Sequence, residues 1–255
     1  MTSSPFDLTG KTAVVTGGGR GLGRGISEAL LEAGADVVVL GRSALPESLT
    51  LYADRLGRSV SLSLVDLGDP DAVDATALAL LAERKVDILV NNAGMQDRYP
   101  AADFPLDAWD RVVSVNLRAV FQLCQLCQLF GRPMLERGEG KIVHLASLLS
   151  FQGGLNFIAY AASKGGVAQL TKALCNEWSG KGINVNAIAP GYVETEMNTA
   201  LLGDAARLEQ LSTRIPAGRW GTPADIGNVV VFLASPAAAY VHGQILAVDG
   251  GWMAR

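Results

Sequence analysis

The chain has 255 residues, of which 49% are hydrophobic and 18% are charged, and its formal net charge is −4. This length and composition suit one large α/β domain whose strands are covered by helices on both faces. The acidic balance excludes a large basic surface, so we expect no nucleic-acid partner and no membrane partner.

Short runs rich in β-branched residues alternate with longer helical patterns along the chain. The runs predict seven strands, at residues 12–16, 36–40, 59–65, 87–91, 141–147, 183–189 and 244–248. The patterns between them predict helices over Gly21–Gly34, Asp69–Arg84, Asp107–Arg137, Asn156–Gly180 and Pro223–Ala234. This alternation predicts right-handed βαβ crossovers and a parallel sheet covered by helices on both faces.

Two segments depart from this rhythm. Residues from about Glu194 to Gly221 form a longer and more polar connection, and such connections often act as lids over a substrate. Residues Ile226–Val248 carry no formally charged side chain over a membrane-spanning length. Polar residues and Pro236 interrupt them, so we interpret this stretch as a helix, a break and a short strand.

The remaining sequence gives no sign of export, redox or metal chemistry. The first residues, MTSSPFDLTGKTAVVTG, lack the pattern of a signal peptide, so we expect a cytoplasmic protein. Cys124 and Cys127 form one C-x-x-C pair without a second pair or a thioredoxin-like context, and we interpret them as packing residues. His144 and His242 have no ligand-like spacing, so we expect no metal site.

The stretch AYAASKGG places Tyr160 and Lys164 four residues apart in a predicted helix. Positions i and i+4 share a helix face, so the ammonium can lie beside the phenol, lower its pKa and favour proton transfer near neutral pH. An isolated Tyr-x-x-x-Lys motif is more often part of an ordinary surface helix, so the rest of the sequence has to decide between the two interpretations.

The first predicted strand runs directly into TGGGRGLG, which opens a helix. Gly17, Gly21 and Gly23 satisfy T-G-x-x-x-G-x-G rather than G-x-G-x-x-G. Glycines at such a turn let the backbone approach a pyrophosphate, and the helix N-terminus offers it free N–H groups. An ordinary tight turn is the alternative interpretation.

Further motifs follow in order. They are NNAG at residues 91–94, Asn116 in SVNL, Ser147 thirteen residues before Tyr160, and PG at residues 190–191. Together with the glycine turn and Lys164, they make the chain resemble the classical short-chain dehydrogenase/reductase family over essentially its whole length. The resemblance implies a single-domain, Rossmann-like, doubly wound α/β fold with a seven-stranded parallel sheet. It also implies hydride transfer between a nicotinamide coenzyme and a secondary alcohol or ketone.

The resemblance assigns roles to individual residues. Tyr160 is expected to be the general acid/base, and Lys164 to lower its pKa and hold the nicotinamide ribose. Ser147 is expected to bind the substrate oxygen, and Asn116 to bend a helix and hold a water of a proton relay. The implied coenzyme contacts are Gly17, Arg20, Gly21, Leu22, Gly23, Gly41, Arg42, Ser43, Asp66, Leu67, Asn91, Ala93, Gly94, Tyr160, Lys164, Pro190, Gly191, Val193 and Thr195.

The end of the second predicted strand bears on the choice of coenzyme. It ends VLGRS, so Gly41 stands where NAD-specific relatives carry an acidic residue for the adenosine ribose. Arg42, Arg20 and Ser43 can contact a 2′-phosphate instead. NADP(H) is therefore favoured, and NAD(H) is the alternative because Arg42 can also stack on adenine.

Strings in the second half, among them LASLLSFQGG, RIPAGRWG and VDGGWMAR, resemble the branch of the family that acts on sugar acids. This implies a substrate of the 3-deoxy-hexulosonate or gluconate type. Arg98 is expected to bind its carboxylate and Gln152 a hydroxyl, beside Ser147 and Tyr160; a solvated surface arginine is the alternative for Arg98. Other readings of the whole chain are an enzyme for another small ketone or acyl ketone, and a dinucleotide-binding redox sensor without turnover.

The resemblance further implies a homotetramer, in which the helices Asp107–Arg137 and Asn156–Gly180 pack against those of a second copy. The apolar run FQLCQLCQLF and the aromatic tail VDGGWMAR support this expectation, since exposed apolar surface needs a partner. The apolar run is equally compatible with an internal core.

Overall fold

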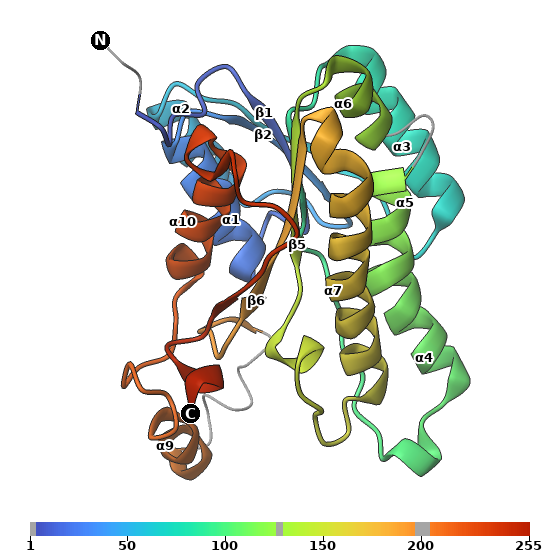
Figure 1. The fold of residues 1–255 in the computed structure, drawn as a ribbon, viewed down its shortest axis with the longest axis vertical. Coiled ribbons are helices and arrows are strands. Elements are labelled where there is room, and N and C mark those ends of the chain that lie inside the picture. The colour runs from blue at the N-terminus through green and yellow to red at the C-terminus, as the bar shows by residue number, and fades with distance from the viewer. Residues whose placement is uncertain (1–3, 126–129, 197–204) are drawn as a thin grey trace.

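A single seven-stranded sheet forms the centre of the protein, whose computed structural model describes residues 4–125, 130–196 and 205–255 (Figure 1). The strands are β1 (Thr12–Thr16), β2 (Asp36–Gly41), β3 (Val60–Leu64), β4 (Ile88–Asn91), β5 (Gly140–Leu145), β6 (Ile183–Pro190) and β7 (Ile245–Val248). All neighbours pair in parallel, in the order β3-β2-β1-β4-β5-β6-β7. The predicted fold is therefore confirmed.

Helices cover both faces of this sheet (Figure 1). On one face lie α1 (Gly21–Glu32), α2 (Glu47–Arg55) and α10 (Pro223–Ala234). On the other lie α3 (Pro70–Glu83), α4 (Leu106–Val113), α5 (Ala119–Gln125), α6 (Gly131–Arg137) and α7 (Ile158–Trp178). The short helix α9 (Ala205–Ser212) lies beside the C-terminus, away from both layers.

Alternation along the strands creates the two halves of the core. In β1, Ala13 and Val15 join the apolar cluster under α1 and α10, whereas Val14 joins the cluster under α3 and α7. Successive side chains of a strand point to opposite faces, so a strand buried on both sides must be apolar throughout. The order of the strands reverses between β1 and β4, and doubly wound sheets bind their ligands at the carboxyl ends of the strands there.

The predicted elements agree with the structure except in four places. One is α9, which lies in the segment 194–221 that was predicted as a polar connection. The predicted continuous helix Asp107–Arg137 is wrong, because α4 passes into a π-helical segment, Ser114–Arg118, before α5 and α6 follow. The helix α2 was missed, since only Leu49 and Ala53 of its residues are buried and its apolar stripe is weak. The fifth strand stops before Ser147, which instead begins a 3₁₀ turn, Leu148–Ser150.

The uncharged stretch Ile226–Val248 folds as predicted. It contains the rest of α10, a 3₁₀ turn at Pro236–Ala238 and the strand β7. No helix in the described parts of the chain is long and apolar enough to cross a membrane.

Candidate active site

The glycine turn after β1 leaves the N-terminus of α1 open. Gly17 and Gly21 have left-handed φ angles of 66° and 51°, which residues with a Cβ rarely adopt. A Cβ on Gly23 would lie 2.0 Å from the carbonyl oxygen of Gly17, so only glycine fits between turn and helix. Among the described residues, the N-cap residue Arg20 makes no side-chain capping hydrogen bond, and Leu22 packs onto the core below. The free N–H groups of the first turn can therefore bind a phosphate.

Thr16 and Asn92 connect this turn to the NNAG segment, a role that the sequence analysis did not assign. The Thr16 hydroxyl accepts hydrogen bonds from the backbone N–H groups of Asn92 and Ala93, both at 2.9 Å. The Asn92 amide donates to the Thr16 carbonyl at 2.8 Å. Asn91, expected to contact adenosine through its backbone, has a buried side chain that donates to the Cys124 thiol.

The ends of β2 and β3 bring the predicted adenosine contacts together. The Arg42 guanidinium lies 3.6 Å from the Asp66 carboxylate, and both side chains are exposed. A Cβ on Gly41 would meet no atom within 4 Å, so the space beside it is open. Ser43 is exposed, and Leu67 packs against the core under α3. Arg20 instead has its ion pair with Glu196, at 3.8 Å.

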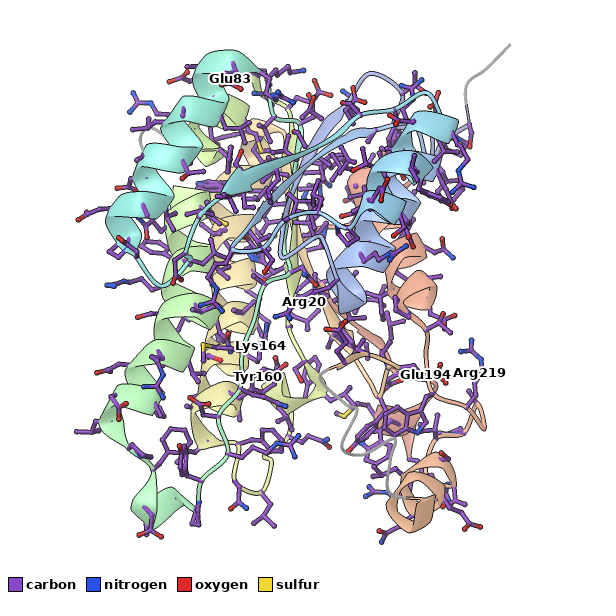
Figure 2. All side chains as sticks on the ribbon, turned by 180° about the vertical axis from the view of Figure 1, so that it is seen from behind. Arg20, Glu83, Tyr160, Lys164, Glu194 and Arg219 are labelled. Carbon is purple, nitrogen blue, oxygen red and sulfur yellow. The ribbon has the colours of Figure 1, made fainter. Side chains whose placement is uncertain are left out.

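Tyr160 and Lys164 lie one turn apart on α7 (Figure 2). Ser147 shares a hydrogen bond with the phenol, and its hydroxyl also accepts from the backbone of Leu149 at 3.2 Å. The Lys164 ammonium is buried and donates to the Leu145 carbonyl at 2.5 Å, while its nitrogen lies 5.7 Å from the centre of the Tyr160 ring. The structure thus brings together Ser147, Tyr160 and Lys164, three of the residues that the resemblance predicts to be catalytic.

Burial shifts the pKa values of both groups. It raises the pKa of Tyr160, and the hydrogen bond with Ser147 only partly offsets this. In this structure burial is the largest influence on the phenol pKa, and the Lys164 ammonium is directed at Leu145. Burial also lowers the pKa of Lys164 to about 8. Burial and the nearby Lys164 lower the pKa of His144 to about 3, so this imidazole is neutral at pH 7.

Asn116 explains the π-helical segment that divides the predicted long helix. Its side chain accepts from the Met95 N–H and donates to the Met95 carbonyl, both at 2.9 Å, and donates to Ser163 at 3.1 Å. A Cβ built on Gly94 would lie 3.5 Å from the Asn116 oxygen and 3.6 Å from the Lys164 nitrogen. Gly94, Asn116 and Lys164 therefore lie close together.

The segment after β6 closes the site on the side of the glycine turn. Pro190 ends β6, and Gly191 leaves no room for a Cβ, which would lie 2.7 Å from the Asp249 backbone. Val193 is buried and bridges to Gly221, so both ends of residues 194–221 meet at one point. Residues 197–204 of this predicted lid lie outside the described residues.

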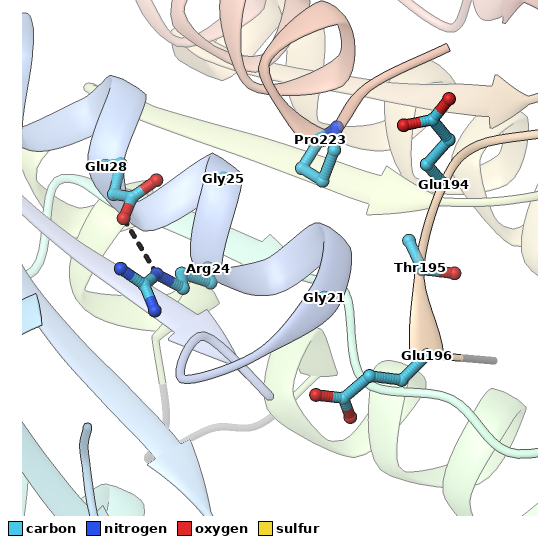
Figure 3. Close-up of a pocket in the computed structure, with 8 residues that line it drawn as sticks. All are labelled: Gly21, Arg24, Gly25, Glu28, Glu194, Thr195, Glu196 and Pro223. Carbon is cyan, nitrogen blue, oxygen red and sulfur yellow. Dashed lines mark hydrogen bonds and ion pairs between the residues drawn. The ribbon is translucent and has the colours of Figure 1, made fainter. Parts of the chain in front are cut away.

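A pocket opens where Thr195 faces the glycine turn (Figure 3). It is lined by Gly21, Arg24, Gly25, Glu28, Glu194, Thr195, Glu196 and Pro223. Two of the predicted coenzyme contacts, Gly21 and Thr195, line this pocket, whereas Ser147, Tyr160 and Lys164 do not. It therefore lies on the coenzyme side of the site.

Arg98 and Tyr160 both contact the ring of Phe157. Its guanidinium carbon is 4.6 Å from the centre of the Phe157 ring, and Phe157 makes an edge contact with Tyr160 at 6.3 Å between ring centres. Gln152 is exposed on the loop after β5. Phe157 was not among the predicted site residues, and an aromatic residue three positions before Tyr160 was the signal available.

Cys124 behaves as the sequence analysis expected for a packing residue. It is fully buried between Asn91 and His144, and burial raises the pKa of its thiol to about 12. The thiol is therefore protonated and unreactive at neutral pH. Its C-x-x-C partner Cys127 lies outside the described residues.

Comparison with known proteins agrees with this geometry. A family model described as enoyl-(acyl carrier protein) reductase matches residues 17–253. A 2-dehydro-3-deoxy-D-gluconate 5-dehydrogenase of Bacillus subtilis is 50% identical over 98% of this chain and 97% of its own. Two solved structures match as well. A candidate 2-deoxy-D-gluconate 3-dehydrogenase of Agrobacterium tumefaciens with bound NADP has a TM-score of 0.92, with 49% identity over 99% and 100% of the two chains. A gluconate 5-dehydrogenase of Burkholderia cenocepacia, in complex with NADP and tartrate, has a TM-score of 0.89, with 40% identity over 98% of each chain.

Proposed function

The chain belongs to the short-chain dehydrogenase/reductase family, and from this premise we propose that it is an oxidoreductase that interconverts a secondary alcohol and a ketone of a sugar acid. The observation that carries the proposal is the Ser147, Tyr160 and Lys164 arrangement beside an open glycine turn. A redox sensor without turnover has no need of this arrangement, and whole-length relatives named as sugar-acid dehydrogenases favour the enzyme.

The residues present fit a nicotinamide coenzyme, because glycines at this turn allow the close approach of a pyrophosphate, and in the described parts of the chain the N-cap Arg20 leaves the first N–H groups of α1 without a side-chain cap. When bound, the coenzyme supplies or accepts the hydride. Tyr160 donates its phenolic proton to the carbonyl oxygen during reduction and removes the alcohol proton during oxidation. Ser147 stabilises the charge that develops on that oxygen. Lys164, charged at pH 7 and fixed to Leu145, provides the positive charge behind the phenol.

The direct test is a substrate panel. Purified protein is mixed with NADP+ or NAD+ and with 2-dehydro-3-deoxy-D-gluconate, D-gluconate, the neutral hexitol galactitol or a β-hydroxyacyl ester. Reduced nicotinamide is followed by its absorbance. The proposal predicts turnover of the sugar acids with the highest kcat/KM; preference for the acyl ester would support the alternative among small and acyl ketones. No turnover of any of them, with coenzyme still bound, would support the sensor.

Arg98 is the cation that we propose for the substrate carboxylate. Its guanidinium makes no hydrogen bond or ion pair with any described residue, and it lies one ring away from Tyr160. Arg98→Ala should raise KM for 2-dehydro-3-deoxy-D-gluconate by about 10-fold or more, as expected for a lost charge-assisted hydrogen bond. KM for galactitol should change little. Equal increases for both compounds would mean that Arg98 is a solvated loop residue.

We propose NADP(H) as the preferred coenzyme, with NAD(H) as the alternative. Gly41 leaves open space, Arg42 is exposed beside it, and related structures were solved with NADP. Gly41→Asp should reverse the preference, because a carboxylate there binds the ribose of NAD and repels a 2′-phosphate. With the same sugar acid as substrate, kcat/KM of the variant for NADP+ should be about 10-fold or more below that of the wild type. The change in kcat/KM for NAD+ should be smaller. A wild type that already prefers NAD+ tenfold contradicts this reading.

We also propose that the protein is cytoplasmic and forms a homotetramer. Within each subunit, we propose that residues 194–221 act as a lid over the substrate. Val193 and Gly221 hold the base of that segment, and Phe121, Leu246 and Met253 are exposed on α5, β7 and the tail. Of the FQLCQLCQLF run, Leu123 and Cys124 are core residues. Sedimentation should give four times the 26.7 kDa chain mass at micromolar concentration. A stable monomer rejects the tetramer, and enrichment in membranes on cell fractionation rejects the location.

A further inference from the structure

Phe157 touches two functional groups at once. Its ring is in edge contact with the Tyr160 phenol and lies under the Arg98 guanidinium. The two distances, 6.3 and 4.6 Å, limit the separation of the Arg98 guanidinium carbon and the Tyr160 ring centre to about 11 Å. One small substrate can therefore reach both groups.

The backbone around Phe157 is tightly constrained. Phe157 precedes the first residue of α7, and its neighbour Asn156 has a φ of 66°, a left-handed conformation that costs a residue with a Cβ energy. A Cβ on Gly154 would lie 2.9 Å from the Leu149 side chain and 3.3 Å from the Phe157 Cβ. The chain that leads into α7 thus constrains the backbone at Phe157.

Arg98, in contrast, comes from a loop without regular structure after β4. Within the described parts of the chain, its only contact of charge or ring type is with Phe157. A guanidinium above an aromatic face is attracted to it and keeps its N–H donors available for a carboxylate. Phe157 is therefore what orients this cation relative to the rest of the site.

We propose that Phe157 is a positioning residue that sets the distance between the carboxylate-binding Arg98 and the proton-transferring Tyr160. This inference rests on the proposed sugar-acid function. Because a hexonate carries several hydroxyls, a fixed distance from carboxylate to phenol selects which of its carbons is oxidised. Phe157 thus contributes to specificity within the sugar acids without bonding to the substrate itself.

The experiment is a double-mutant cycle measured with 2-dehydro-3-deoxy-D-gluconate. Phe157→Leu, and Phe157→Met as a second variant, remove the ring face but keep an apolar side chain. Each should raise KM about 5-fold, as expected for the loss of a cation–π contact, with a smaller change in kcat. Phe157→Tyr should retain the wild-type KM. In the Arg98→Ala background, Phe157→Leu should have no further effect on KM, because the two residues act together.

Phe104→Leu is the matched control. Phe104 makes an edge contact with Tyr99, the neighbour of Arg98, at 5.3 Å between ring centres, and no cation from the described parts of the chain lies above it. It should leave KM unchanged. Additive effects of Phe157→Leu and Arg98→Ala, or a loss of kcat with constant KM, overturn the inference while leaving the proposed function intact. If Arg98→Ala itself has no effect on a wild type that oxidises the acid, the carboxylate site is elsewhere and the inference fails with it.

Discussion

Replacing Tyr160 with phenylalanine is expected to lower kcat by about 100-fold or more, the usual contribution of a general acid or base. The variant keeps the ring that packs against Phe157 and removes only the proton donor. Burial raises the pKa of this phenol, so it is protonated at pH 7 in the free protein and suited to donate a proton during reduction. The measurement is steady-state turnover in both directions, together with coenzyme binding by fluorescence, which separates a loss of proton transfer from a loss of coenzyme.

Tyr240→Phe provides the control for this experiment, since Tyr240 is 99% exposed and lies in the turn before β7. It should have wild-type activity and thermal stability. A Tyr160→Phe protein that retains most of its activity would remove the phenol from the mechanism.

Replacing Lys164 with methionine is expected to abolish most activity and yet stabilise the folded protein. Burial lowers the pKa of this lysine from 10.5 to about 8, which corresponds to about 3 kcal/mol of folding free energy at neutral pH. Methionine avoids this cost but leaves the Leu145 carbonyl without its donor, which costs about 1 kcal/mol or more. We expect a net gain of about 2 kcal/mol at pH 7, measured by urea unfolding, with kcat reduced by about 100-fold or more.

The pH dependence of this gain follows from the direction of the shift. Below pH 8 the lysine is charged in the folded and the unfolded chain, so the wild type bears the full cost of the buried charge. Between pH 8 and 10.5 the folded lysine loses its proton while the unfolded one keeps it, and the wild type recovers stability. The advantage of Lys164→Met should therefore shrink across this window. Lys172→Met, an exposed position on the same helix, should show neither the gain nor its pH dependence. A Lys164→Met protein that is less stable than the wild type at pH 7 would contradict the assigned cost.

Much of the fold could be predicted because its signals are local. The bounds of α10 were correct, and they follow from Thr222, Pro223 and Asp225, which cap the helix within its first turn. The glycine turn could be predicted equally well, because positive φ angles at Gly17 and Gly21 depend on the residue type at those positions. The parallel sheet was predicted from the alternation of elements, since parallel neighbours require crossover helices, whereas the order of the strands came from the structure.

Other features arise only from contacts between distant segments. The π-helical turn at Asn116 depends on hydrogen bonds to Met95, 21 residues earlier, and the apolar pattern of the helix carries no trace of them. The missed role of Thr16 likewise depends on Asn92, 76 residues later.

The chemistry of the site also depends partly on local sequence and partly on tertiary contacts. The sequence by itself determined which groups are present and that Tyr160 and Lys164 share one helix face, because helix geometry relates residues four positions apart. Only the tertiary structure decided that both groups are buried, that the ammonium turns to Leu145, and that Arg98 meets Phe157. A pKa depends on the solvent and charges that surround a group, and these are set by the packing of α7 against β5 and the loop after β4. Local spacing cannot specify that packing, which is why the direction of the Tyr160 shift had to come from the folded chain.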